Sequence, residues 1–173
     1  MDPLLVYVWT AKPLTNEHIK PERTPMQKEL VILDEDKVWA KARTATLDAE
    51  IQALGPEFYD VFNQSSETWH DNAPFDALRD RQSVLDAERQ QLRGVLRSSL
   101  PTLPKQRRGE VGIGSSVTLE NGKKYFIAGD WTPFAGQIHD GSVIISCQAP
   151  LAQQLRGKRV GETVQAGRIV TLA

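Results

Sequence analysis

Residues 30–61 read LVILDEDKVWAKARTATLDAEIQALGPEFYDV and contain two interleaved sets of positions seven residues apart. One set is Leu30, Lys37, Thr44, Ile51 and Phe58, and the other is Leu33, Ala40, Leu47, Leu54 and Val61. The alternating steps of three and four residues are typical of the apolar seam of a coiled coil. Pro56 falls inside the pattern, but the last members of both sets stay in phase. We therefore expect a helix that kinks at Pro56 rather than ends there.

A second seam of the same kind follows residues 64–72, a polar segment that we interpret as a turn. This second helix begins near Ala73, where Pro74 is tolerated in the first turn, and it ends at the Leu100–Pro101 dipeptide. Its seam positions are Phe75, Leu78, Gln82, Leu85, Arg89, Leu92 and Leu96. Two such helices joined by a short turn fold back on each other to cover their apolar stripes. The sequence thus predicts an antiparallel helical hairpin, a finger about 40 Å long.

The rest of the chain divides into a leader and a β-rich part. Prolines at positions 3, 13, 21 and 25 argue against a long helix in the leader. After an exposed linker at 105–109, alternating apolar runs separated by Asn-Gly, Asp-Gly and Gly turn signals predict four or five antiparallel strands, with a short helix near 150–155. We expect an α+β chain with a leader over 1–25, a coiled-coil finger over 26–101 whose tip lies near 64–72, and a small antiparallel β domain over 105–173.

Composition excludes several classes of protein. The chain has 173 residues, a formal net charge of −1 and one cysteine. A single cysteine rules out an intramolecular disulfide and a zinc site built from several cysteines. No apolar run approaches the roughly 18 to 20 residues that span a bilayer, and the start has no basic segment typical of a signal peptide. We expect a cytoplasmic protein with no membrane partner.

Charge is unevenly distributed along the chain. Residues 1–100 contain 12 Lys or Arg and 17 Asp or Glu, whereas residues 101–173 contain 9 and 5. Residues 44–78 contain no Lys or Arg but carry seven acids: Asp48, Glu50, Glu57, Asp60, Glu67, Asp71 and Asp76. This stretch is either a solvated acidic face or an element that approaches a cation or a basic wall.

Two segments carry a resemblance to a known family. Residues 145–164, ISCQAPLAQQLRGKRVGETV, resemble the C-terminal signature of the bacterial Gre transcription factors, GreA and GreB, which reads I-S-x-x-S-P-L-A near its start and L-x-G-K-x-V-G-D-x-V near its end. Ala149 stands where that family usually has serine. Residues 71–77, DNAPFDA, are similar to the family's E-N-A-x-Y-x-A, which opens the second finger helix. The resemblance implies a finger followed by an FKBP-like C-terminal domain.

The resemblance also implies a function. Gre factors insert the finger into the secondary channel of RNA polymerase, where tip carboxylates help to hold a second Mg²⁺ and orient a water that cleaves a backtracked transcript. Carboxylate oxygens are suitable Mg²⁺ ligands, and two-metal cleavage needs a positioned water. The implied partners are RNA polymerase and the nascent RNA 3′ end. The resemblance implies a monomeric accessory factor rather than an enzyme, with no cofactor of its own beyond the Mg²⁺ in the polymerase active site.

Residues 67–72, ETWHDN, match the family's tip motif G-D-x-x-E-N. The second acid falls on Asp71, and the first falls on Thr68, with Glu67 one residue earlier. The resemblance therefore makes Asp71 and Glu67 the candidate tip acids and ligands of the shared Mg²⁺, and it gives four candidate tip contacts: Thr68, Trp69, His70 and Asn72. From the residues alone, Asp71 or Asn72 instead caps the second helix. The shifted acid leaves open a Gre-like inhibitor that occupies the channel without stimulating cleavage.

Two further sets of residues have a functional and a structural interpretation. Arg79, Arg89 and Arg93 either contact transcript phosphates, as the resemblance implies, or form ion pairs along a helix face. By resemblance, polymerase docks on Ala149, Pro150 and Leu151, which otherwise only start a short helix. Two other functions stay open: an FKBP-like interaction or chaperone module, such as a prolyl isomerase, and a protein whose coiled coil merely dimerises.

Overall fold

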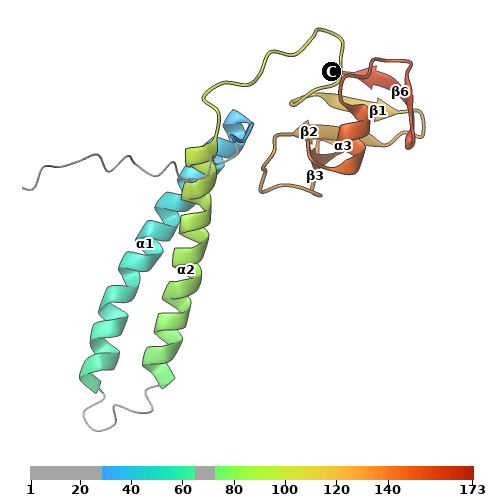
Figure 1. Ribbon diagram of the computed structural model, residues 1–173. Coiled ribbons are helices and arrows are strands. Elements are labelled where there is room, and N and C mark those ends of the chain that lie inside the picture. The colour runs from blue at the N-terminus through green and yellow to red at the C-terminus, as the bar shows by residue number, and fades with distance from the viewer. Residues whose placement is uncertain (1–28, 65–72) are drawn as a thin grey trace, which may run out of the picture.

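The structure is a computed structural model that describes residues 29–64 and 73–173. Two long helices come first, α1 (Asp34–Gln64) and α2 (Ala73–Ser98). A β domain follows, with β1 (Ser116–Leu119), β2 (Lys124–Ala128), β3 (Ile138–His139), β4 (Ser142–Ser146), α3 (Pro150–Leu155), β5 (Thr163–Val164) and β6 (Gly167–Leu172). The predicted order of a helical hairpin and then a small β domain is confirmed, and Figure 1 shows the hairpin projecting from that domain as a rod.

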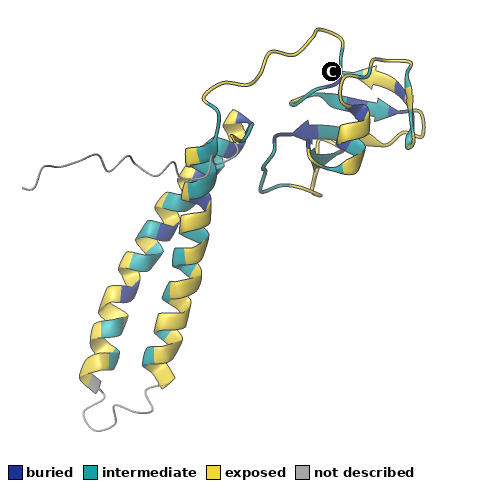
Figure 2. Ribbon diagram, in the orientation of Figure 1, coloured by how far each residue is buried: buried dark blue, intermediate teal, exposed yellow. Residues whose placement is uncertain are grey.

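The hairpin is held together by one of the two predicted heptad sets. Leu33, Ala40, Leu47 and Leu54 are all buried, and Leu47 and Leu54 are at most 1% exposed. The members of the other set on α1 are only half-buried, the apolar Ile51 and Phe58 as well as Lys37 and Thr44. As Figure 2 shows, the buried positions on α1 face α2 and the outer faces of both helices are exposed. Helix α1 continues through Pro56, as predicted.

The first helix starts later than the seam suggested. Leu30 is not helical; its N–H donates to the Ser98 carbonyl, and its own carbonyl accepts a bond from the Leu100 N–H. Three acids, Asp34, Glu35 and Asp36, form the first turn of α1, where negative charge is favourable at a helix N-terminus. The seam predicted a helix that includes Leu30, and this was wrong, because residues 29–33 are not helical and instead pair with the end of α2 and approach the β domain.

The sheet has six strands in the order β3-β4-β2-β1-β6-β5. All neighbours are antiparallel except β2 and β4, which pair in parallel with Tyr125 opposite Val143. The expectation of four or five antiparallel strands therefore missed the two-residue strand β3 and this parallel pair. Strands β3 and β4 are joined by a turn at Asp140 and Gly141, both with positive φ, as an Asp-Gly turn of this type requires. Helix α3 covers one face of the sheet, where Leu155 and Ile169 are fully buried.

Candidate functional site

The distal end of the hairpin is the first part of the candidate site. Phe58 of α1 and Phe75 of α2 form an edge-to-face ring pair with centroids 5.5 Å apart. This contact brings the end of α1 next to the start of α2, at the end of the hairpin far from the β domain (Figure 1). The predicted tip acids Asp71 and Glu67, and the predicted tip contacts Thr68, Trp69, His70 and Asn72, lie outside the described residues.

Some acids on the described parts of the hairpin pair with arginines, and others do not. Asp48 accepts hydrogen bonds from Arg89 at 3.0 Å and Arg93 at 2.9 Å, and the bond from Arg89 is the main reason why the pKa of Asp48 lies below its usual value. Glu57 pairs with Arg81 at 3.6 Å. Asp60, nearer the end of α1, has no ion-pair partner among the described residues. Asp60 therefore adds uncompensated negative charge near the distal end of the hairpin, whereas Asp48 and Glu57 are paired with arginines of α2.

The arginines that were predicted to contact transcript phosphates lie on α2 and pair with acids of the hairpin. Arg89 is half-buried between Asp48 and Asp86, and Arg93 shares Asp48 with it. Arg79 pairs with Asp76 at 3.3 Å and is exposed. Their positions across the two helices show that Arg89 and Arg93 link α2 to α1. Arg79, whose partner is on its own helix, is the most accessible of the three to a ligand.

The predicted docking residues lie at the start of α3. Ala149 has extended backbone geometry just before the helix, and Pro150 occupies its first turn without a side-chain cap. Pro150 is exposed, whereas Ala149 and Leu151 are half-buried and pack against the core of the β domain. The three residues thus form a rigid, partly apolar corner, with Pro150 as its exposed part.

A joint between the hairpin and the β domain was not predicted. The Val31 N–H donates to the Asp130 carboxylate at 2.7 Å, and the Asp130 N–H donates to the Val31 carbonyl at 2.6 Å. Nearby, Trp39 of α1 packs against Trp131 and Phe134, with ring centroids 6.2 and 6.0 Å apart. The tryptophans were the available signal, since two large aromatic side chains outside the seam need a surface to cover them.

Asp36 is the unusual ionisable group of this joint. Its side chain is 4% exposed, and Oδ1 accepts a hydrogen bond from the Thr132 hydroxyl at 3.0 Å. Among the described residues, no group bonds the buried Oδ2. Burial raises the pKa of Asp36, although the bond from Thr132 opposes the shift. Cys147, on the opposite side of Asp130, is also buried, and its pKa is raised to about 11.

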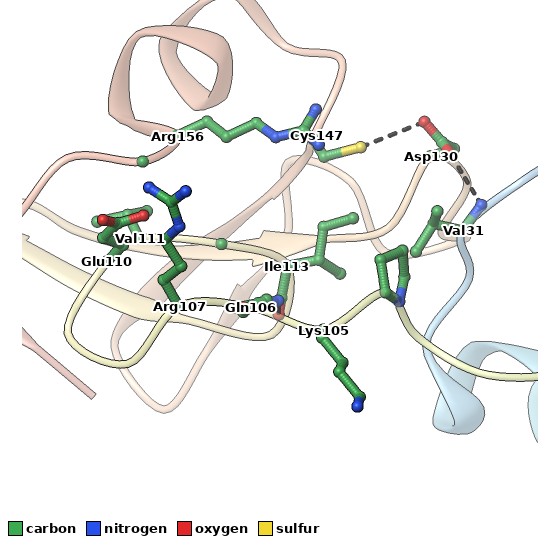
Figure 3. A pocket seen from close by; sticks show the side chains of 13 residues that line it. Val31, Lys105, Gln106, Arg107, Glu110, Val111, Ile113, Asp130, Cys147 and Arg156 are labelled. Atoms are coloured by element: carbon green, nitrogen blue, oxygen red, sulfur yellow. Dashed lines mark hydrogen bonds between the residues drawn. The ribbon is translucent and has the colours of Figure 1, made fainter.

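Two hollows flank the joint. The larger, of about 670 Å³, lies against the sheet face that α3 leaves open and is lined by Leu33, Phe126, Phe134 and Ile144. The smaller, of about 290 Å³, lies beneath the linker that connects α2 to β1, beside Cys147 and Asp130 (Figure 3). Sequence reasoning found neither hollow, because each combines residues from the joint with residues of the β domain.

Within residues 29–64 and 73–173, no three His, Cys, Asp or Glu side chains come together in a way that could hold a metal ion. In the same part of the chain, neither long helix is apolar enough over a sufficient length to cross a bilayer.

Comparison with known proteins gives a family match for the β domain. The model of the family described as transcription elongation factor GreA/GreB, C-terminal domain, matches residues 105–169. Among solved structures, the chain is similar to GreA factor homolog 1 (Gfh1) of Thermus thermophilus, with 19% identity, 84% of this chain and 99% of that chain covered, and a TM-score of 0.40. It is likewise similar to Gfh1 of Thermus aquaticus, with 19% identity, the same coverages and a TM-score of 0.39.

No curated protein is similar enough to this chain to count as a match. The family match covers the linker, all strands but the end of β6, and α3 with its Pro150 corner. It includes residues 145–164, on which the resemblance to Gre factors was based, and so confirms that resemblance. Residues 105–169 of this chain therefore match the C-terminal domain of the GreA/GreB transcription elongation factors.

Proposed function

We propose that this protein binds RNA polymerase, enters its secondary channel with the helical hairpin, and modulates transcript elongation. The observation that carries the proposal is the combination of a GreA/GreB-type C-terminal domain with a rod that projects from it. At about 1.5 Å per residue, the 26 residues of α2 give this rod a length of about 40 Å. Such a length suits a narrow channel that leads to a buried catalytic centre.

Charge at the end of the rod supports the same function. Phe58 and Phe75 keep the two helix ends together, and Asp60 adds uncompensated negative charge beside the connecting segment. Mg²⁺ is a hard cation that prefers carboxylate and water oxygens, so an acidic tip is suited to the metal site of the polymerase. In this proposal Asp71 and Glu67 contact that Mg²⁺, the polymerase performs the cleavage, and the protein acts as an accessory factor.

Binding is tested first, by a pull-down of purified RNA polymerase with the full chain. We expect retention of the polymerase, and we expect Pro150→Ser to weaken it, because Pro150 is the exposed residue of the docking corner. Gln153→Ser is the matched control, since Gln153 is exposed on the same short helix. Absence of polymerase binding by the unaltered chain would contradict the proposal.

Cleavage is tested on stalled, backtracked complexes. Asp71→Ala and Glu67→Ala, made separately, are expected to lower stimulated cleavage by about a hundredfold where the altered acid positions the metal or the water. Glu120→Ala is the control, because it removes one exposed acid from the β domain, at the turn after β1 and away from the hairpin. If all three variants cleave equally well, the tip acids have no role in the reaction.

The inhibitory alternative is favoured by one observation, the position of the tip acids. Glu67 stands one residue before the position at which the family's tip motif has its first acid. A carboxylate shifted by one residue in a turn points in another direction, and a preorganised site tolerates little misplacement. A chain that binds polymerase, slows elongation and stimulates no cleavage would establish this alternative.

A further inference from the structure

A second charged surface lies at the other end of the molecule and plays no part in the proposed function. The linker between α2 and β1 carries Lys105, Arg107 and Arg108, all exposed, and Arg156 lies next to it at the end of α3. Figure 2 shows this linker exposed along most of its length. We call these four residues the linker cation surface.

Within the described part of the chain, these cations have no anionic partner, in contrast to the arginines that join the two helices of the hairpin. On the hairpin, Arg43, Arg89 and Arg93 all bind carboxylates at 3.1 Å or less. Among the described residues, no carboxylate lies within ion-pair distance of any side chain of the linker cation surface. Two acids lie close by, but Glu110 pairs with Arg159 at 2.9 Å and Asp130 binds the Val31 N–H. The positive charge is therefore available to a ligand.

The four side chains surround two adjoining hollows. The first is the 290 Å³ hollow, and Figure 3 shows Arg107 and Arg156 entering it from opposite walls, while Lys105 extends outward. The second, of about 740 Å³, is lined by Arg107, Arg108 and Arg159. Since Arg107 borders both, the positive charge is continuous over a surface longer than either hollow.

We propose that the linker cation surface binds the phosphate groups of a nucleic acid backbone. A guanidinium group is planar and matches phosphate with two parallel hydrogen bonds, so three arginines on one surface favour phosphate over other anions. The cations are spread over two open hollows rather than converging in one closed pocket, which suits a chain of phosphates. Neither hollow is lined by an aromatic side chain that could stack on a base, so binding is independent of nucleotide sequence.

Binding is measured by fluorescence anisotropy of a labelled single-stranded RNA of about 20 nucleotides, titrated with the full chain over a series of salt concentrations. We expect affinity to fall linearly with salt on logarithmic axes. The variant R107Q/R108Q removes two contacts to RNA phosphates. We therefore expect the slope of the logarithm of the binding constant against the logarithm of salt concentration to become shallower by about 1.4, and the affinity at moderate salt to fall about tenfold.

The matched control is K123Q/K124Q. It also removes two adjacent exposed cations and so has the same net charge, but these lie just before β2 and at its first residue. We expect this control to leave the slope nearly unchanged. An equal loss of RNA affinity in the two variants would show a general effect of net charge and would overturn the proposal. A failure of the unaltered chain to bind RNA would overturn it as well.

Competition distinguishes the possible sources of phosphate. Unlabelled RNA is expected to displace the labelled RNA at far lower phosphate concentration than inorganic pyrophosphate does. Equal competition would indicate a site for a small phosphorylated molecule and would contradict the assignment to a backbone. The proposal is independent of polymerase binding: R107Q/R108Q is expected to retain polymerase in the pull-down, and loss of polymerase with unchanged RNA binding would show instead that the surface binds an acidic protein.

Discussion

Asp36 shows how a single residue at the joint makes the stability of the molecule depend on pH. Its carboxyl group is buried beside Thr132, with Glu35 adding further negative charge, and its pKa is raised above the ordinary value of 3.8. The folded protein therefore holds this proton more tightly than the unfolded chain. The resulting stabilisation is fully present below pH 3.8 and is lost as the pH rises through the raised pKa of the folded state.

Asp36→Asn isolates this effect. Asparagine can still accept the bond from the Thr132 hydroxyl, but it carries no charge at any pH. We expect the free energy of unfolding of the variant, relative to the unaltered chain, to increase as the pH rises from about 3 to about 7. Urea denaturation at several pH values measures this difference. A difference that stays constant over the whole range would show that Asp36 titrates normally in the folded protein.

No sequence pattern pointed to Asp36, because one acid among three at the start of a helix cannot be told in the sequence from an ordinary N-terminal acid. Its burial depends on Thr132, which is 96 residues away in the chain. The burial of Cys147, in contrast, is what a free cysteine next to a β-rich run usually shows, because a thiol behaves as a small apolar side chain.

At the scale of elements, the hairpin was predictable because burial along its seam is periodic. Leu33, Ala40, Leu47 and Leu54 stand seven residues apart, and all four are buried. Leu92 is buried in the same core as Leu47, so the seam is covered within one chain. The sheet was less predictable, because alternation identifies strands but does not say which strands are neighbours. The parallel pairing of β2 with β4 therefore had no signal in the sequence.

Leu47→Ala tests the importance of the seam. Leu47 is fully buried between the helices, so we expect the variant to lose about 2–5 kcal/mol of unfolding free energy. Val38→Ala, on the same helix, is the control, because Val38 is 66% exposed and little is lost when its side chain is shortened. Denaturation followed by helical circular dichroism measures both, and equal effects would mean that the helices do not pack along this seam.

At the scale of the whole molecule, the joint holds the base of the hairpin against the β domain. Gly129 lies against the backbone of residues 31 and 32, and a Cβ atom at position 129 would overlap the Val31 carbonyl oxygen. That oxygen is fixed because it accepts the hydrogen bond from the Asp130 N–H. Glycine is therefore required at position 129 for the close approach of the two backbones.

Gly129→Ala is expected to destabilise the protein by about 1–3 kcal/mol, because neither backbone can move without breaking the joint. Gly94→Ala is the control, since a Cβ atom there meets nothing within 4 Å and alanine is the better helix former. We expect the control to be stabilised by about 0.5–1 kcal/mol. Thermal unfolding of both variants provides the comparison, and a neutral Gly129→Ala would mean that the joint is open in solution.

The proposed function requires the far end of the rod to reach the catalytic centre of RNA polymerase. Replacing the catalytic Mg²⁺ of the polymerase by Fe²⁺ generates hydroxyl radicals at that centre, and these cut only the nearby backbone of a bound protein. We expect cuts in this chain between the end of α1 and the start of α2, and none in residues 105–173. Cuts confined to the β domain, or no cuts in a complex that has formed, would contradict the account.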